Sequence, residues 1–370
     1  MNITFRADAS LHIGTGHVMR CLTLADALSA QSANCQFICR QHEGHLIELI
    51  RSKGYVVHVL TAQNTDGEAK TKVLPSAAKL AHSHWLGASQ AQDAAACAPI
   101  LAMQPADWLV VDHYALDTHW ESALMQHYRK LMVIDDLADR HHVCDLLLDQ
   151  TFDRSANDYR PLVPEHCQLL CGAAYALLRP EFAALRPYSL QRRVQPALRQ
   201  LLINMGGVDK GNVTGQVLRA LHDCPLAADC HIIVVMGANA PWLDSVREQV
   251  QSLPWSTTML VGVNNMAQLM ADSDLAIGAA GATSWERCCL GLPTIMLVLA
   301  ENQKMIATGL ENAEAVKLIS LTLDMSSELK RLIVKFNNDP SQLLKISKAA
   351  AHIISGQGLG ATLQKMESAL

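Results

Sequence analysis

The chain has 370 residues, of which 50% are hydrophobic and 18% are charged, and its formal net charge is −5 at pH 7. This length suits two domains better than one core, and so low a charged fraction is not typical of a disordered chain. Without a basic excess the chain is not expected to bind the phosphate backbone of a nucleic acid, although local Lys and Arg residues could hold one small anionic ligand.

The first predicted element is a strand in "NITFRAD", with no basic segment or signal-peptide cleavage site before it. No apolar run along the chain reaches the roughly 18 residues that a membrane-spanning helix needs. The 11 cysteines are scattered without a CxxC pair, which favours buried, reduced thiols. We therefore expect a cytoplasmic protein that makes no contact with a membrane.

The next element is a helix that begins at or near His17, directly after Gly14 and Gly16. Its apolar residues recur at helical spacing: Val18, Cys21, Leu22, Ala25 and Leu28. A helix N-terminus disfavours the imidazolium ion, so the neutral imidazole that a general base needs is favoured at His17. On the residues alone, His17 is either such a base or a structural, capping histidine.

The two glycines also match part of the dinucleotide-binding fingerprint GxGxxG. The third glycine position is occupied by Met19. The following strand, "CQFICR", ends in Arg40 where an acidic residue would bind the ribose. An NADP-binding site could use that arginine, but the missing third glycine still disfavours a dinucleotide site.

Further strands of the first half alternate with amphipathic helical patterns, such as "HLIELIRSKG", which Gly54 would end. The predicted strands are "ITFRA", "CQFICR", "YVVHVL", "WLVVD", "LMVID", "DLLLD" and "QLLCG". Residues 61–100 are less regular and predict loop and short helix. The group Asp112, His113 and Asp117 is not part of an HExxH or Cys/His framework, so no metal site is expected.

A stretch with two prolines and four arginines, "RPYSLQRRVQPALRQ" at residues 186–200, predicts an interdomain linker. The alternation then resumes with the strands "LLINM", "HIIVVMG", "TTMLVG", "DLAIG" and "PTIMLV", and the tail after about residue 323 has a helical pattern. We therefore predict an α/β protein with two Rossmann-like, doubly wound domains that face a cleft, at residues 1–190 and 195–370.

Ligands of open α/β sheets bind beyond the carboxyl ends of the strands. Two loops there, "GGVDKGN" with Gly207 and "GAAGATSWE" with Gly281, place paired glycines before a helix, where N–H groups and the helix dipole favour a phosphate. Glu286, inside the helix after Gly281, is placed to accept hydrogen bonds from a ribose diol; the alternative is an ordinary helix-start glutamate. "GATSW" does not match the nucleophile elbow GxSxG, so a serine hydrolase has no support.

Several motifs over about residues 3–310 resemble the PseG family, the UDP-2,4-diacetamido-2,4,6-trideoxy-β-L-altropyranose hydrolases of pseudaminic acid synthesis. They are, in order, "RADASLHIGTGHVMRCLTLA", "HWLGASQAQDA", "WLVVDHYALDTHWE", "VIDDLADRHHVCDLLLDQ", "YALLRPEF", "GGVDKGNVTG" and "GAAGATSWERCCLGLPTIMLVLAENQ". The second half is also similar to the nucleotide-binding half of MurG-type glycosyltransferases, which have the GT-B fold. The resemblance therefore implies a GT-B-like arrangement of the two domains.

The resemblance implies that water attacks the anomeric carbon of a UDP-sugar, that UDP leaves, and that the sugar is released with inverted configuration, without a metal or other cofactor. It implies that His17 is the base that activates the water, on the loop that contains Gly16. Tyr114 and Asn302 would lie near the sugar and the leaving diphosphate.

The resemblance further implies that Glu286 binds the ribose and that Asn212 adds a second contact from the C-terminal half. Arg6 and Asp8, at the end of the first strand, would be orienting or substrate-binding groups. Two other hypotheses stay open: a GT-B glycosyltransferase with the same donor site, and a non-catalytic sugar-nucleotide binding protein, which would have no need of His17. The N-acyl groups of the sugar, the final glycoconjugate and the oligomeric state also stay open.

Overall fold

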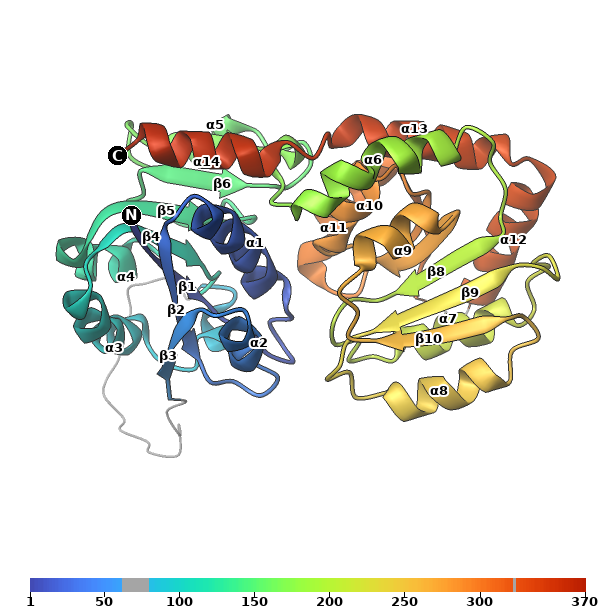
Figure 1. The fold of residues 1–370 in the computed structure, drawn as a ribbon, viewed down its shortest axis with the longest axis horizontal. Coiled ribbons are helices and arrows are strands. Elements are labelled where there is room, and N and C mark those ends of the chain that lie inside the picture. The colour runs from blue at the N-terminus through green and yellow to red at the C-terminus, as the bar shows by residue number, and fades with distance from the viewer. Residues whose placement is uncertain (62–79, 322–323) are drawn as a thin grey trace. The chain divides into compact units, whose positions relative to one another are not determined.

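The structure, a computed structural model, describes residues 1–61, 80–321 and 324–370 (Figure 1). The chain divides into two compact units. Unit 1 comprises Met1–Gln150, Arg154–Leu177 and Leu359–Leu370, and unit 2 comprises Thr151–Asp153 and Leu178–Gly358. Within the described ranges no helix is both long enough and apolar enough to cross a lipid bilayer.

Unit 1 is built on a parallel sheet whose described strands follow the order β3-β2-β1-β4-β5-β6-β7. The strands are β1 (Asn2–Ala7), β2 (Asn34–Arg40), β3 (Val56–Leu60), β4 (Ala106–Asp112), β5 (Tyr128–Ile134), β6 (Leu146–Asp149) and β7 (Gln168–Cys171). The helices are α1 (Gly16–Ala30), α2 (Ile47–Ser52), α3 (Gln90–Met103), α4 (Thr118–Ala123), α5 (Ala156–Tyr159) and α14 (Gly358–Ser368). The order reverses direction between β1 and β4, as in a doubly wound sheet.

Alternate residues of these strands enter two different apolar cores, one on each face of the sheet. Phe37 and Val110 belong to the core that also contains residues of α1, α2 and α14. Their neighbours Ile38 and Val111 belong to the core that contains residues of α3 and α4. Because successive side chains of a strand point to opposite faces, a strand buried on both faces is a continuous apolar run, which is why these strands stand out in the sequence.

Unit 2 repeats this plan with the strand order β10-β9-β8-β11-β12-β13. The strands are β8 (Gln200–Asn204), β9 (His231–Met236), β10 (Thr257–Val261), β11 (Leu275–Ala279), β12 (Thr294–Leu297) and β13 (Lys317–Leu318). The helices are α6 (Pro180–Arg192), α7 (Val213–Leu221), α8 (Leu243–Gln251), α9 (Met266–Asp272), α10 (Thr283–Cys289), α11 (Lys304–Asn312), α12 (Met325–Asn338) and α13 (Ser341–Ile353). Residues of α7 and α12 share one core with the strands.

The predicted fold class of two doubly wound α/β domains is confirmed, and every predicted strand is present. The sequence did not predict β13, because this edge strand has only two residues and one of them is Lys317. All the cysteines are free thiols, and all but Cys171 are buried, as expected.

The boundary between the units differs from the predicted linker at residues 186–200. The chain enters unit 2 at Leu178, and the first part of the arginine-rich stretch, up to Arg192, belongs to α6. Arg186 donates to the carbonyl oxygens of Cys289 and Ala351, and Arg193 donates to that of Ser273 at 2.6 Å. These arginines are therefore anchors to the backbone of unit 2 rather than parts of a solvated linker.

The last helix, α14, also departs from the predicted division, which placed the whole tail in the C-terminal domain. Leu359 and Met366 of this helix pack in the core of unit 1.

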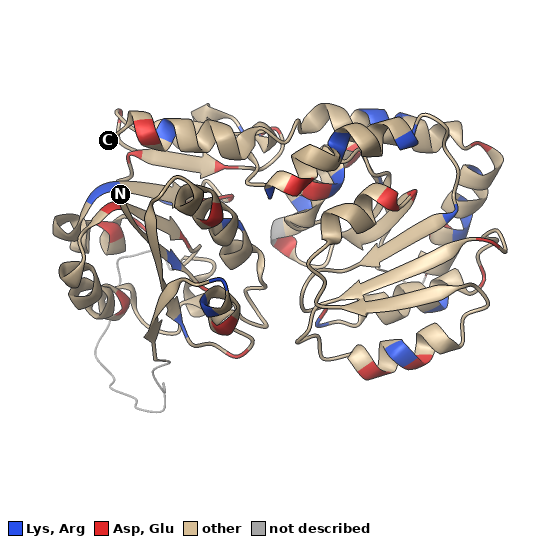
Figure 2. Ribbon diagram, in the orientation of Figure 1, with Lys and Arg blue, Asp and Glu red and all other residues tan. Residues whose placement is uncertain are grey.

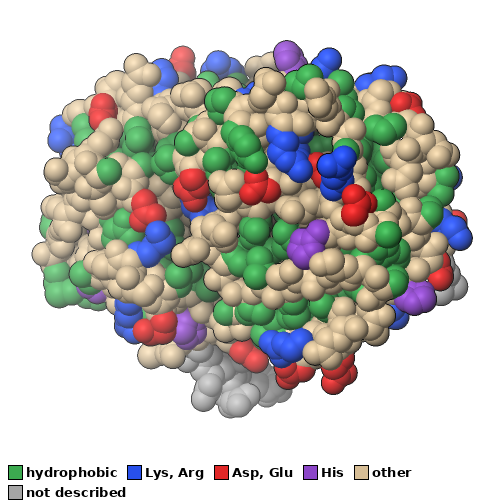
Figure 3. Space-filling view, turned by 45° about the vertical axis from the view of Figure 1, so that its right-hand side comes forward, with side chains coloured by type: hydrophobic (Ala, Val, Ile, Leu, Met, Phe, Trp, Pro, Cys, Tyr) green, Lys and Arg blue, Asp and Glu red, His purple; other side chains and the backbone are tan. Residues whose placement is uncertain are grey.

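Lys and Arg are interspersed with Asp and Glu in both units (Figure 2), and the face in Figure 3 carries no extended basic stripe.

Candidate active site

The loop between β1 and α1 fixes the start of the helix that carries His17. The Ser10 hydroxyl accepts hydrogen bonds from the N–H groups two and three residues later (3.1 and 2.9 Å), and its carbonyl oxygen accepts one from Gly14 (2.9 Å). Gly14 has φ +81°, which a residue with a Cβ rarely adopts. The chain therefore turns tightly, and α1 begins at Gly16 with His17 in its first turn.

The imidazole of His17 is held by a carboxylate. His17 Nδ1 lies 2.5 Å from Oδ1 of Asp112, the last residue of β4. Asp112 is buried completely, whereas His17 is 7% exposed. Because an ionised carboxylate can only accept a hydrogen bond, Nδ1 carries the proton, and the lone pair on Nε2 is left for a base.

Arg20 keeps Asp112 ionised. It lies one turn after His17 on α1 and donates to both carboxylate oxygens of Asp112, at 2.6 and 2.7 Å. Burial alone would raise the pKa of Asp112, but the charges of Arg20 and then of His17 outweigh burial and lower it below its usual range. Arg20 also donates to Oδ2 of Asp136 at 2.6 Å. One arginine thus serves two carboxylates, and the excess negative charge stabilises the imidazolium that forms when His17 takes a proton.

Tyr114 lies beside the imidazole of His17, and its predicted position near the sugar stays a prediction. Its ring meets that of His17 edge-on, with centroids 4.6 Å apart and planes at 83°. Its hydroxyl donates to Oδ2 of Asp136 at 2.6 Å. Burial and the charge of Asp136 raise the pKa of Tyr114 well above its usual value, so the hydroxyl stays protonated and its position is fixed.

Arg6 and Asp8 do not occupy the exposed positions that a substrate-binding role needs. They are 0% and 1% exposed. Arg6 donates to both carboxylate oxygens of Asp93 on α3 and to Oδ1 of Asp8 at 2.6 Å, and the same oxygen accepts from the N–H of Arg40 at 2.6 Å. Of the two roles predicted for them, their burial favours the orienting one: these side chains join the ends of β1 and β2 to α3, beneath the site.

Three functional residues were missed in the sequence: Arg20, Asp112 and Asp136. Asp112 ends β4, and Asp136 follows the neighbouring strand β5 in the motif "VIDD". Carboxylates directly after adjacent strands of a parallel sheet meet at the same edge, so their positions were a usable signal. Which of them contacts His17 depends on α1 lying over β4, which spacing does not reveal.

In unit 2, the N–H groups at the start of α7 are capped by side chains of the preceding loop. Asp209 accepts hydrogen bonds from the N–H groups of Val213 (2.8 Å) and Thr214 (2.9 Å), and Asn212 Oδ1 accepts from that of Gly215 (3.1 Å). Asn212 itself has a left-handed backbone, with φ +49°. These three amide groups, which follow the motif "GGVDKGN", are therefore occupied, and the diphosphate contact predicted for Gly207 stays a prediction.

Gly207 lies in close contact with the loop after β9. A Cβ on Gly237 would collide with the carbonyl oxygen of Gly207. Gly237→Ala is therefore expected to lower the free energy of unfolding by about 1–3 kcal/mol, as measured by urea denaturation. Gly360→Ala is the matched control, because a Cβ there meets nothing within 4 Å and alanine favours the helix. Equal stability of the Gly237 variant and the wild type would contradict the tight contact.

Glu286 lies in the first turn of α10, and its side chain is 19% exposed. Burial raises the pKa of Glu286 to about 7, and the charges of Arg179 and Arg287 only partly oppose this. Arg179 Nη2 is 3.9 Å from Glu286 Oε1. The carboxyl group thus has acceptor capacity left for a ligand and is poised to ionise near neutral pH.

The loop that contains Gly281 is supported from beneath and from one side. Arg287 is buried and donates to the carbonyl oxygen of Ala279 at 2.6 Å, which ties the end of β11 to α10. A Cβ on Gly281 would lie 4.0 Å from Nε2 of Gln303, in the 3-10 helix Glu301–Gln303. Asn302 belongs to the same short helix, but its side chain lies outside the described part of the structure.

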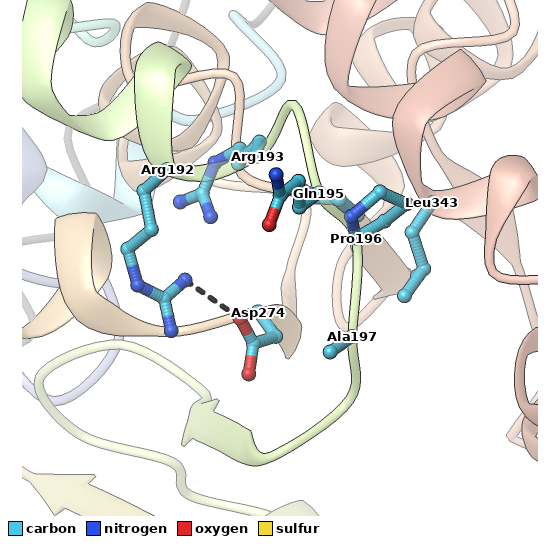
Figure 4. A pocket seen from close by; sticks show the side chains of 8 residues that line it. Arg192, Arg193, Gln195, Pro196, Ala197, Asp274 and Leu343 are labelled. Carbon is cyan, nitrogen blue, oxygen red and sulfur yellow. Dashed lines mark ion pairs between the residues drawn. The ribbon is translucent and has the colours of Figure 1, made fainter.

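A small pocket in unit 2 lies away from all of these residues (Figure 4). Arg192 pairs with Asp274 at 2.6 Å on its wall, and Ala197 also lines it. Ala197 and Asp274 precede β8 and β11, so the pocket is at the amino ends of the strands, opposite to the edge where α/β sheets bind ligands.

Comparisons with known proteins support both the fold and the motifs. Residues 205–358 match the glycosyltransferase family 28 C-terminal domain, a range that includes Gly207, Asn212, Gly281 and Glu286. Over 311 residues the chain is 26% identical to UDP-2,4-diacetamido-2,4,6-trideoxy-beta-L-altropyranose hydrolase of Campylobacter jejuni, covering 84% of this chain and 96% of that protein. It is 28% identical over 204 residues to spore coat polysaccharide biosynthesis protein SpsG of Bacillus subtilis, covering 54% and 58% of the two chains.

Two solved structures share the fold over the full length. MurG of Acinetobacter baumannii has a TM-score of 0.70 at 14% identity, covering 99% of both chains. Alr3699/HepE of Anabaena, solved with UDP and glucose, has a TM-score of 0.56 at 15% identity, covering 100% of both. The GT-B-like fold and the resemblance to the PseG hydrolases, both predicted from the sequence, are confirmed.

Proposed function

We propose that this protein hydrolyses UDP-2,4-diacetamido-2,4,6-trideoxy-β-L-altropyranose to UDP and the free sugar. The observation that carries the proposal is the 2.5 Å contact between His17 Nδ1 and the buried carboxylate of Asp112, which leaves Nε2 as a base. The 26% identity with a hydrolase of this name over 84% of the chain supports the choice of substrate.

In the proposed reaction, Nε2 of His17 takes a proton from water as the water oxygen bonds to the anomeric carbon. The bond between that carbon and the oxygen of the β-phosphate breaks, and its electron pair leaves with UDP. Attack on the face opposite to the leaving group inverts the anomeric configuration. Asp112 holds the imidazole in the required tautomer throughout and stabilises its positive charge.

Unit 2 is proposed to bind UDP. Glu286 in its ionised form accepts hydrogen bonds from both hydroxyls of the ribose diol, and the loop around Gly281 faces the diphosphate with backbone N–H groups. The match of residues 205–358 to a glycosyltransferase C-terminal domain, and the UDP bound to a protein of the same fold, support this division of labour.

The proposal predicts that the affinity for a UDP-sugar depends on the ionisation of Glu286. A pKa of about 7 leaves this carboxyl mostly protonated below pH 7, where it loses one of its acceptors. The Kd for an intact UDP-sugar should therefore be about tenfold higher at pH 6 than at pH 8. A UDP-sugar is the better probe, because the terminal phosphate of UDP itself titrates near pH 6.

Glu286→Gln supplies the control, since it preserves the shape and cannot ionise. It should bind the UDP-sugar more weakly at pH 8, and its Kd should not change with pH over the same interval. Calorimetry on both proteins makes the comparison. A pH dependence that survives in Glu286→Gln would remove Glu286 from the ribose site.

A glycosyltransferase is the second candidate function, favoured by the family 28 match. The two are separated by incubating the purified protein with the UDP-trideoxyaltrose donor, without any acceptor, and following UDP and the anomer of the released sugar. Hydrolysis predicts stoichiometric UDP and the inverted sugar. UDP release that begins only when an acceptor is added would replace the proposal with a transferase. Binding without turnover under either condition would leave a sugar-nucleotide binding protein.

A further inference from the structure

Trp85 of the motif "HWLGASQAQDA" belongs to an aromatic cluster, with His82 and Tyr114, that the proposed chemistry has not used. Trp85 ends the 3-10 helix Ser83–Trp85, and its ring lies nearly parallel to that of Tyr114, with centroids 5.7 Å apart and planes at 24°. The ring of His82 lies 4.3 Å from that of Trp85 and 5.6 Å from that of Tyr114. Trp85 also meets the imidazole of His17 edge-on at 6.2 Å. The rings of Tyr114 and Trp85 therefore lie beside the proposed base, and the ring of His82 packs against both of them.

The segment that carries this cluster is held firmly in unit 1. Leu86, next to Trp85, is 1% exposed and belongs to the core shared with α3 and α4. Gly87 has φ +66°, and a Cβ there would lie only 3.0 Å from the ring of His42. Ser89 then closes the start of α3 with a capping box. Side chains on a segment fixed at several points are suited to a precise binding surface.

The cluster presents an apolar surface to solvent. Tyr114 is buried, whereas Trp85 and His82 are only partly buried, so their rings form its accessible part. Burial lowers the pKa of His82, which keeps its ring uncharged at neutral pH. The charges of the neighbouring arginines are paired: Arg140, 5.8 Å from the Tyr114 ring, pairs with Asp135 at 2.8 Å, and Arg20 pairs with Asp112 and Asp136. Pockets for small molecules typically combine such aromatic surface with a few polar groups, here His17.

We propose that Trp85 and His82 form the wall of the sugar subsite and select for the apolar substituents of the donor sugar. This inference rests on the proposed function, because the anomeric carbon must lie next to the water that His17 activates. A sugar with a methyl group at C6 and two acetamido methyls presents carbon surface where ordinary hexoses present hydroxyl groups. An aromatic wall favours the sugar with the methyl groups, because a hydroxyl group placed against aromatic rings loses its hydrogen bonds to water.

Three variants test the wall. Trp85→Ala removes it, Trp85→Phe restores an aromatic ring, and Trp255→Ala removes a partly buried tryptophan before β10 in unit 2 as a matched control. We expect Trp85→Ala to lower kcat/KM for the trideoxy sugar nucleotide by about ten- to a hundredfold, with the inhibition constant of UDP unchanged. Trp85→Phe should recover most of the loss, and the preference over a UDP-hexose with a C6 hydroxyl should shrink in Trp85→Ala.

An unchanged kcat/KM in Trp85→Ala would refute the proposed role of Trp85 in sugar binding. A loss of affinity for UDP as large as the loss of kcat/KM would also refute it, because it would indicate a general structural effect. A wild-type protein that releases no UDP refutes the proposed hydrolysis, and calorimetry then tests the wall on its own. In that case the trideoxy sugar nucleotide should bind more tightly than UDP, and Trp85→Ala should abolish the difference. If Trp85→Ala still bound the trideoxy sugar nucleotide more tightly than UDP, the proposed sugar subsite would be refuted, whichever reaction the protein catalyses.

Discussion

Replacing His17 with alanine is expected to lower kcat by about two to four orders of magnitude and to leave the affinity for UDP nearly unchanged. The alanine variant has no group to take the proton from water. Asp112 keeps both of its hydrogen bonds from Arg20, so its buried charge stays paired and unit 1 should stay folded. The groups assigned to UDP binding all lie in unit 2 and are not changed.

Initial rates of UDP release and calorimetry with UDP measure the two quantities. His58→Ala is the matched control, because His58 is a half-buried histidine of unit 1 whose Nε2 pairs with Gln36 at 3.0 Å. Its turnover should stay close to that of the wild type. Full turnover in His17→Ala would refute the assignment of the base and, with it, the proposed mechanism.

Replacing Asp112 with asparagine is expected to lower kcat by about two to three orders of magnitude, less than or as much as the loss of His17. The amide can donate to Nδ1, which shifts the proton of the imidazole to Nε2 and removes the lone pair that activates water. The variant also leaves Arg20 paired with Asp136 alone, so thermal unfolding must be measured alongside the rate.

The double variant separates catalysis from folding. If Asp112 acts only through the imidazole, adding Asp112→Asn to His17→Ala should cost little further activity, because residues that act as a unit are not additive. The part of the stability loss that comes from the ion pair of Asp112 with Arg20, in contrast, should appear in both backgrounds. Multiplicative loss of kcat in the double variant would show that Asp112 has a role independent of His17.

The central strands could be predicted from the sequence because burial on both faces makes them continuous apolar runs. The boundary between the units was harder to predict. The arginines in and directly after α6 have the composition of a solvated linker, and only the structure shows the carbonyl groups to which they donate. Arg193, for example, is 4% exposed and binds the backbone of Ser273 and Met270. The sequence of residues 186–200 does not indicate that these arginines hydrogen-bond to backbone carbonyl groups far away in the chain.

The candidate site shows the same limit. His17 was recognisable because a glycine turn and a helix start are local features. The contact of His17 with Asp112, 95 residues later, requires β1 and β4 to be neighbours and α1 to cover them. For Arg6 and Asp8 the sequence left an orienting and a binding role open, because a position at the end of a strand does not tell whether the side chain is covered by another element, here α3.

The return of α14 to unit 1 has a consequence for biogenesis. Unit 1 contains both the first strand and the last helix of the chain, with unit 2 between them. During synthesis unit 2 can therefore complete its core before unit 1 does. Until α14 is synthesised, unit 1 exposes the apolar surface that Leu359 and Met366 later cover. A chain truncated before residue 359 would keep all the groups of the Asp112–His17 pair but would be a candidate for chaperone retention and proteolysis.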